Sequence, residues 1–182
     1  MAKRSKAKSA KKKVAKSKVK PKTKAAKAPV VGSKAPDFKL PDPDLNMKSL
    51  EDYRGKKLIL AFFPAAMSPV CTKEMCSFRD SFQEMNNVGA QVVAVSIDGP
   101  FANKQFTEMH GLNFPVLSDY ARDAVKKYGV LMPDLLHVKR YNAAKRSVFV
   151  IDPDGIVKYK WVSDNPLVEP DYEDIKQVIK TI

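Results

Sequence analysis

The stretch KKLILAFFPAAMSPVCTKEMC, residues 56–76, predicts a strand, a stiff loop and the beginning of a helix. Residues 56–63 carry a continuous apolar run, which is typical of a strand that is buried on both faces of a sheet. Prolines then restrict the loop. From Cys71 onward, apolar residues recur at intervals of three and four, so we expect a helix over 71–89 that ends at Gly89. The apolar stripe of this helix consists of Cys71, Met75, Phe78, Phe82 and Met85.

The rest of the chain continues the alternation of strand and helix signals. Further strands are predicted at 91–98, 114–119, 146–152 and 156–163, and further helices at 101–111, 119–129 and 170–182. The last two strands are joined by a Pro-Asp-Gly turn, which indicates a hairpin. Strand–helix–strand units followed by a hairpin and a final helix predict an α/β protein with a thioredoxin-like fold, in which helices flank a central mixed β-sheet.

Charge divides the chain into two parts. The 182 residues carry a formal net charge of +13. Residues 1–28 contain twelve lysines, one arginine and no acidic residue, so the remainder of the chain holds 20 basic and 20 acidic residues. A segment of this composition cannot bury enough apolar surface to fold by itself. We therefore expect a disordered Lys/Ala-rich tail at 1–29 and one domain at 30–182.

The composition disfavours several classes of protein. The longest apolar stretch, residues 58–67, is too short for a membrane span and contains Pro64. The basic N-terminus lacks the apolar region of a secretory signal, and two cysteines are too few for a disulfide scaffold, so we expect a cytoplasmic protein. The two histidines, His110 and His137, are unsuitably spaced from the cysteines for a structural zinc site. We also expect no bound cofactor.

Cys71 lies at the predicted start of the 71–89 helix. The unpaired N–H groups and the dipole at a helix N-terminus favour negative charge, and hence a thiolate. The hydroxyl of Ser68 stands three residues earlier, and Pro64 and Pro69 stiffen the loop. These features predict a nucleophilic thiol. The alternative is that Cys71 is only a small apolar residue of the core-facing stripe, since inert buried cysteines are common.

The segment from Pro64 to Cys71 resembles the signature of the peroxiredoxins, P-x-x-x-[T/S]-x-x-C. The longer stretch SPVCTKEMCSFRD (68–80) is similar to that of the bacterioferritin-comigratory (Q-type) and one-cysteine alkyl hydroperoxide reductase E-type branch. The further matches are GSKAPDFKLPD, VVAVSID, FPVLSD and RSVFVIDPDGIV. The resemblance therefore extends over residues 30–182, the whole predicted domain.

This resemblance implies a thiol-dependent peroxidase that reduces hydrogen peroxide and organic hydroperoxides. Cys71 stands at the position of the peroxidatic cysteine, which attacks the peroxide and becomes a sulfenic acid. Ser68 stands where a Thr or Ser of the family orients the peroxide, and Pro64 where a proline shields the thiolate from water. The implied reductant is thioredoxin or a similar thiol protein, and the protein is expected to be a monomer or a homodimer.

Arg146 stands where the family's arginine pairs with the thiolate and with the peroxide oxygens. Arg140 and Lys145 are nearby basic residues, but the position immediately before the VFVID strand favours Arg146. Negative charge moves from sulfur to the departing oxygen during the reaction. The Arg146 guanidinium, the Ser68 hydroxyl and the N–H groups of the helix start would stabilise that charge.

Cys76 is predicted about 140° around the helix from Cys71, on the polar face beside Thr72 and Gln83. A cysteine there is either incidental or reactive. The likeness to Q-type peroxiredoxins implies that Cys76 resolves the sulfenic acid by an intramolecular disulfide, whereas the one-cysteine branch implies an external thiol. Cα atoms five residues apart in a helix are separated by roughly 8–9 Å, and a disulfide tolerates at most about 7 Å. Disulfide formation therefore requires the first turns to unwind.

The tail at residues 1–28 resembles linker-histone tails in composition. Its charge predicts salt-sensitive, sequence-independent nucleic-acid binding, with a nucleoid-associated location, or a nuclear one in a eukaryote. The alternatives are a solvated or targeting extension, or a nucleic-acid-associating protein whose domain is only a scaffold. The set Pro64, Ser68, Cys71 and Arg146 favours the enzyme, because a scaffold needs none of it. The tail lacks an apolar face, so no membrane partner is expected.

Overall fold

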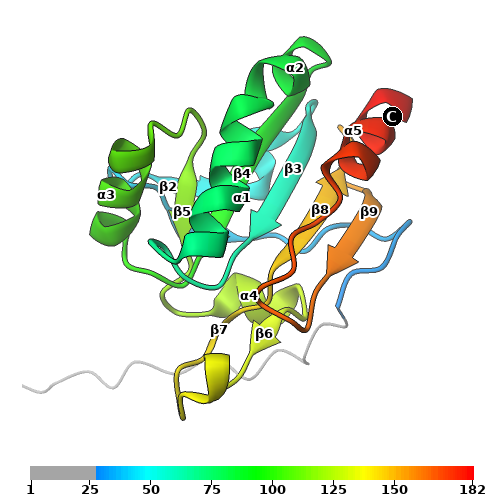
Figure 1. Ribbon diagram of the computed structural model, residues 1–182. Coiled ribbons are helices and arrows are strands. Elements are labelled where there is room, and N and C mark those ends of the chain that lie inside the picture. Colours follow the sequence, from blue (N-terminus) through cyan, green and yellow to red (C-terminus); the bar gives the residue numbers. More distant parts are fainter. Residues whose placement is uncertain (1–27) are drawn as a thin grey trace, which may run out of the picture.

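The computed structural model describes residues 28–182, apart from the side chains of Phe82 and Gln83. The tail predicted to be disordered lies, up to residue 27, outside the described residues. A five-stranded sheet in the order β5-β4-β3-β8-β9 forms the centre (Figure 1). Its strands are β3 (Lys57–Phe62), β4 (Ala90–Ser96), β5 (Val116–Ser118), β8 (Ser147–Ile151) and β9 (Val157–Val162).

The sheet is mixed, as the sequence predicts. β3 and β5 each pair parallel with β4, whereas β8 pairs antiparallel with both β3 and β9. From Leu58 to Phe62 every residue of β3 is buried, because this central strand is covered on both faces. The carboxyl ends of β3 and β4 lie at the same edge of the sheet, where the loop to the first helix begins (Figure 1).

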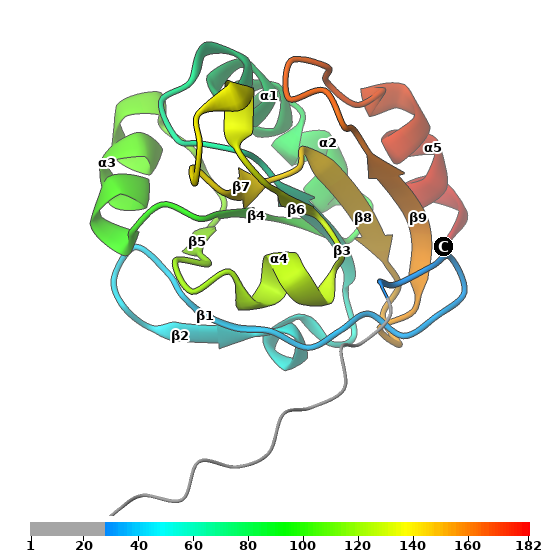
Figure 2. The ribbon, with the colours of Figure 1, turned by 90° about the horizontal axis from the view of Figure 1, so that it is seen from below.

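Four helices pack on one face of the sheet (Figure 2). They are α1 (Pro69–Asp80), α2 (Phe82–Asn87), α3 (Pro100–His110) and α5 (Tyr172–Thr181). The residues predicted to share a face of the last helix do so, since Ile175 and Ile179 are buried and Tyr172 and Ile182 pack against the same cluster. None of the helices in the described part of the chain is long and apolar enough to cross a membrane.

The opposite face is covered by α4 (Asp123–Lys127) and by a hairpin that precedes the central strand. The hairpin comprises β1 (Lys39–Pro41) and β2 (Met47–Ser49), and the 3-10 helix η1 (Leu50–Tyr53) follows it. A small antiparallel pair, β6 (Leu131–Met132) and β7 (Ala143–Ala144), encloses the 3-10 helix η2 (Leu135–His137). Of these elements only the helix α4 was predicted from the sequence; the short strands and the 3-10 helices were not.

The predicted 71–89 helix is in fact two helices, with the boundary at Ser81. The first helix begins at Pro69, two residues before Cys71, because proline is favoured at the first helical position, where its missing N–H is not needed. The predicted stripe residues Cys71, Met75, Phe78 and Met85 are all buried. The prediction for Phe82 falls on a side chain outside those described.

The helix predicted to start at Asp119 begins only at Asp123. Asp119 is not helical; its carboxylate accepts the N–H groups of Asp123 at 2.8 Å and Val125 at 2.7 Å. Arg122, which immediately precedes the helix, has a left-handed backbone with φ 60°. Asp119 therefore caps the first turn of α4 from outside, while the predicted lysines, Lys126 and Lys127, do lie in its last turn.

Candidate active site

The loop from β3 to α1 carries the predicted motif. Its backbone is held from the neighbouring strand, because the N–H of Ala66 donates to Asp98 Oδ2 at 2.8 Å. Ser68 is the N-cap residue of α1, and its carbonyl accepts the N–H of Thr72 at 2.9 Å. Cys71 is consequently the third helical residue, within the turn whose N–H groups have no partner inside the helix.

A pocket of about 120 Å³ adjoins Cys71. Four of the predicted residues line it, namely Pro64, Ser68, Cys71 and Arg146. The rest of the lining is apolar and consists of Ala65, Pro69, Val70, Leu135, Leu136, Pro166 and Leu167. The pocket thus places a few polar groups at the sulfur inside apolar walls.

The guanidinium of Arg146 is fixed against the sulfur of Cys71. Its Nη2 donates to Cys71 Sγ at 3.4 Å, and its Nη1 donates to the carboxylate of Glu74. Nε and Nη2 both donate to the carbonyl of Pro166, at 3.2 and 2.7 Å. Arg146 and Cys71 are each only 1% exposed, so this contact is screened from water.

The two other basic residues considered from the sequence lie differently. Arg140 is exposed, and its backbone N–H donates to Asp134. Lys145 forms an ion pair with the exposed carboxylate of Asp164. Of the three, Arg146 is the one that contacts the sulfur and lines the pocket.

Glu74 is a site residue that the sequence analysis missed. It lies on α1 one turn after Cys71, is 0% exposed and pairs with Arg146. Burial raises the pKa of the Glu74 carboxyl to about 7, although the neighbouring Arg146 opposes the shift. Among the described residues its Oε1 has no hydrogen-bond partner. The sequence did contain a signal, because an acidic residue three positions after Cys71 lies beside the apolar stripe of the helix.

Cys76 is not part of the pocket. It lies off the buried stripe of α1, as predicted, but it is half-buried and not fully exposed. The predicted neighbour Thr72 is half-buried as well, and the side chain of Gln83 is outside those described. Both cysteines are free thiols in this structure. The structure therefore brings Pro64, Ser68 and Arg146 to Cys71 but leaves Cys76 apart.

The connection from β9 to α5, residues 163–171, crosses over α1. Besides the Pro166 carbonyl on Arg146, it contributes Glu169, which pairs with Lys73 of α1 at 2.6 Å and accepts the hydroxyl of Tyr172 at 2.8 Å. The Tyr172 ring meets Phe78 of α1 edge-on, with centroids 5.4 Å apart. The connection and the start of α5 are therefore tied to α1 at Lys73 and at Phe78.

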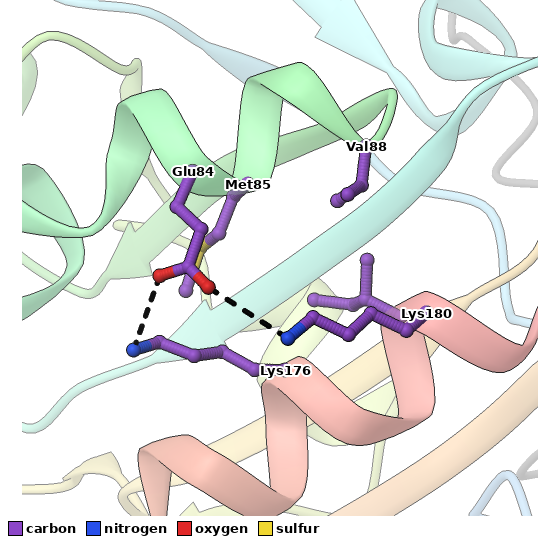
Figure 3. Close-up of a pocket in the computed structure, with 6 residues that line it drawn as sticks. Glu84, Met85, Val88, Lys176 and Lys180 are labelled. Atoms are coloured by element: carbon purple, nitrogen blue, oxygen red, sulfur yellow. Dashed lines mark ion pairs between the residues drawn. The ribbon is translucent and has the colours of Figure 1, made fainter.

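A second, small pocket lies between α2 and α5 (Figure 3). Glu84 reaches across it toward Lys176 at 3.3 Å and Lys180 at 3.8 Å. It contains none of the predicted site residues, and its ion pairs join the two helices. As for metals, the described residues hold no group of three or more His, Cys, Asp or Glu side chains that could bind an ion.

Residues 31–160 match the model of the AhpC/TSA family. The chain belongs to this family. A putative peroxiredoxin of Mycobacterium tuberculosis (strain H37Rv) is 43% identical over 124 residues, which cover 68% of this chain and 79% of the relative. Peroxiredoxin Bcp of Escherichia coli (strain K12) is 35% identical over 128 residues, which cover 70% of this chain and 82% of the relative.

Solved structures agree with this membership of the AhpC/TSA family. Peroxidoxin BcpB from Mycobacterium tuberculosis has a TM-score of 0.73 at 32% identity, over 84% of this chain and 97% of that one. A peroxiredoxin-like protein from Aquifex aeolicus has a TM-score of 0.76 at 30% identity, over 86% and 90%. The thioredoxin-like fold and the resemblance to peroxiredoxins are confirmed, and the chain is a thiol-dependent peroxidase, an oxidoreductase.

Proposed function

We propose that this peroxidase attacks peroxide with Cys71 and then closes a disulfide between Cys71 and Cys76. The observation that carries the first role is the 3.4 Å contact between Arg146 Nη2 and the Cys71 sulfur inside the pocket. A guanidinium that donates to a cysteine sulfur favours the thiolate, which is the nucleophilic form. Among the described residues no cation donates a hydrogen bond to Cys76, although Arg79 lies near enough for its charge to interact with that thiol.

The pocket supports a direct displacement on the peroxide. The Cys71 thiolate attacks one oxygen, the O–O bond breaks, and negative charge develops on the departing oxygen. Arg146, which its hydrogen bonds hold in place, and Ser68 line the pocket beside Cys71, and the first N–H groups of α1 lie at the same end of the helix, so these donors would stabilise the developing charge. Pro64 closes the loop side of the pocket and excludes water from the thiolate. The product is a sulfenic acid on Cys71.

The apolar walls favour organic hydroperoxides as substrates beside hydrogen peroxide. Leu136 and Leu167 stand at the pocket with exposed fractions of 62% and 61%. A hydroperoxide whose reacting oxygens lie at Cys71 would rest its organic substituent on these side chains. Covering such apolar surface contributes about 25 cal/mol per Å².

We further propose that Cys76 resolves the sulfenic acid and that a thioredoxin-type dithiol protein reduces the resulting disulfide. Cys76 is half-buried on the helix that carries Cys71, so a modest unwinding exposes it to the sulfenic acid. The free, unpaired state of both thiols is compatible with such a cycle. Resolution by an external thiol is the alternative.

Mass spectrometry after one equivalent of peroxide tests both roles. The unchanged protein should show a Cys71–Cys76 disulfide, and Cys76→Ser should stop at a sulfenic acid on Cys71 after consuming one peroxide. Cys71→Ser should consume none. Full single-turnover activity of Cys71→Ser would exclude the mechanism, and a persistent sulfenic acid in the unchanged protein would assign resolution to an external thiol.

A second role is proposed for the basic tail. The whole excess of positive charge lies in residues 1–28, and the remaining chain is balanced at 20 basic and 20 acidic residues. A segment of this charge neutralises phosphates and releases their counterions, which supports sequence-independent contact with nucleic acid. We infer a cytoplasmic peroxidase that is held near nucleic acid by this segment.

A further inference from the structure

Three ionisable groups form one buried cluster beneath the pocket. Cys71 and Arg146 are 1% exposed and Glu74 is 0% exposed. Arg146 lies between the other two and donates to both of them. One positive charge therefore serves two groups that can each be negative. If both were ionised, the cluster would carry a net negative charge out of contact with water, which is strongly unfavourable.

Asp119, the other buried carboxylate among the described residues, differs from Glu74 in its donors: burial raises the pKa of Asp119 too, but hydrogen bonds from backbone N–H groups oppose that rise. Both oxygens of Asp119 accept backbone N–H groups, from Asp123 at 2.8 Å and from Val125 at 2.7 Å. Glu74 receives no such donors among the described residues. Its Oε2 accepts from the shared guanidinium, and its Oε1 has no partner. A proton on Oε1 of Glu74 would remove this uncompensated charge, and the hydrogen bond from Arg146 to Oε2 would be kept.

The other charged groups near Glu74 act in the same direction. Glu169, from the connection before α5, lies close enough that its negative charge adds to the rise in the Glu74 pKa, which burial brings to about 7. Glu169 is itself paired with Lys73 and bonded to the hydroxyl of Tyr172, so neither of these donors compensates Glu74. Arg146 is the one cation that contacts Glu74 in the described part of the chain.

We propose that Glu74 holds a proton while Cys71 is a thiolate and releases it when Cys71 is oxidised, so that the buried cluster stays neutral throughout. This inference rests on the proposed role of Cys71 as the thiol that attacks peroxide. Glu74 acts through Arg146, whose positive charge is balanced by the Cys71 thiolate before oxidation and by the Glu74 carboxylate after it. Glu74 is therefore a positioning residue, which holds the guanidinium in place and keeps the charge of the cluster constant.

The Cys71 thiolate, a hydroperoxide ROOH and the protonated Glu74 yield the Cys71 sulfenic acid, the alcohol ROH and the Glu74 carboxylate. The O–O bond breaks and an S–O bond forms; sulfur loses two electrons and the peroxide gains them. The proton that Glu74 loses equals the one that the departing alkoxide gains. When a dithiol later reduces the oxidised Cys71 to a thiolate, Glu74 binds a proton again.

Difference infrared spectroscopy tests the proposal, because protonated and ionised carboxyl groups absorb at separate frequencies. Cys76→Ser protein, in which the sulfenic acid persists, is measured before and after one equivalent of peroxide at about pH 6, below the pKa of the buried carboxyl. We expect the loss of about one protonated carboxyl band per oxidised Cys71, with gain of a carboxylate band. Labelling with carbon-13 glutamate assigns the band without any substitution at position 74.

Two variants and a second pH complete the test. Adding Glu74→Gln should abolish the carboxyl signal, whereas Glu108→Gln, at an exposed glutamate, should leave it intact. At about pH 8 the signal should shrink, because Glu74 is then largely ionised before oxidation. Mass spectrometry on the same samples distinguishes the proposed proton release by Glu74 from the proposed attack of Cys71 on peroxide. Oxidised Cys71 without a carboxyl change overturns the role of Glu74 alone, and failure to oxidise Cys71 overturns the proposed function as well.

Discussion

At the scale of single residues, the proposed chemistry depends most on Arg146. Its buried guanidinium donates to three partners, the Glu74 carboxylate, the Cys71 sulfur and the Pro166 carbonyl. A planar guanidinium reaches several acceptors at fixed angles, whereas a lysine ammonium is a compact point charge. Arg146 can therefore contact the Cys71 sulfur and its other two partners at once because its guanidinium is planar, and not because of its charge alone.

We expect Arg146→Ala to slow the attack of Cys71 on peroxide by about 10²–10³-fold, the usual scale for the loss of one charge-stabilising donor. Arg146→Lys should recover only part of this rate, because one ammonium cannot replace the fork. Stopped-flow measurement of the second-order rate constant of peroxide consumption provides the comparison.

Arg140→Ala is the matched control, since Arg140 is exposed and lies six residues earlier in the chain. Its rate constant should stay within about twofold of the unchanged protein, as for most surface substitutions. A slow Arg140→Ala variant beside a normal Arg146→Lys variant would show that the wrong arginine has been assigned.

The residues of the pocket differ in how far a sequence can predict them. The 64–71 motif and Arg146 could be placed, because a short loop and a strand boundary carry the residues that resemble the peroxiredoxin pattern. Leu136 and Leu167 could not, since they reach the pocket through irregular segments. The backbone at Leu136, with φ 51°, is left-handed and is imposed by tertiary contacts that leave no local pattern. Glu74 could have been found, as an acid beside an apolar helical stripe.

At the scale of elements, the proposed disulfide requires that helix α1 presents Cys71 and then unwinds so that Cys76 can reach it. Its far end is anchored, because α2 continues directly from it and Glu84 of α2 pairs with Lys176 and Lys180 of α5 (Figure 3). Its first turns are held by the 163–171 connection through the pair of Lys73 and Glu169. The contacts of this connection therefore oppose disulfide formation.

Removing one of these contacts should speed the formation of the disulfide. Tyr172→Phe keeps the ring on Phe78 but deletes the hydroxyl that donates to Glu169 at 2.8 Å. A hydrogen bond to a charged group contributes about 1.5–3 kcal/mol, so we expect the conversion of sulfenic acid to disulfide to rise by about tenfold. Rapid-quench alkylation followed by mass spectrometry measures the conversion.

Tyr159→Phe provides the comparison, because Tyr159 lies on β9 and has no hydrogen bond to the 163–171 connection among those of the described residues. It should leave the conversion rate unchanged. Equal rates in Tyr172→Phe and the unchanged protein would mean that unwinding of α1 is not limited by this contact.

The sequence predicted the elements with long periodic patterns and missed the short ones. β3 and α5 were found because their apolar patterns extend over six and ten residues. The three-residue strands β1 and β2 are too short to show alternation, and their pairing is set by the hairpin and the core beneath it. Apolar spacing continues across Ser81, so periodicity alone reads α1 and α2 as one helix.

At the scale of the whole molecule, charge and chemistry occupy different parts of the chain. All residues of the proposed site lie between Pro64 and Leu167, whereas the thirteen basic residues that create the net charge of +13 lie in residues 1–27. Electrostatic attraction to a polyanion acts through charge alone and needs no folded site. Binding to nucleic acid and reduction of peroxide should therefore be separable.

Deletion of residues 1–27 removes all thirteen of these basic residues and leaves every described residue in place. We expect the full-length protein to bind duplex DNA with little sequence preference, and log K to fall with log salt by about 0.9 per phosphate neutralised. The truncated protein should not bind, and its rate of peroxide reduction should be unchanged. Paired salt titrations and turnover assays measure both. DNA binding by the truncated protein would assign the interaction to the domain. If the full-length protein does not bind DNA at low salt, the tail does not have the proposed role. Loss of turnover on truncation would show that the tail contributes to the enzyme.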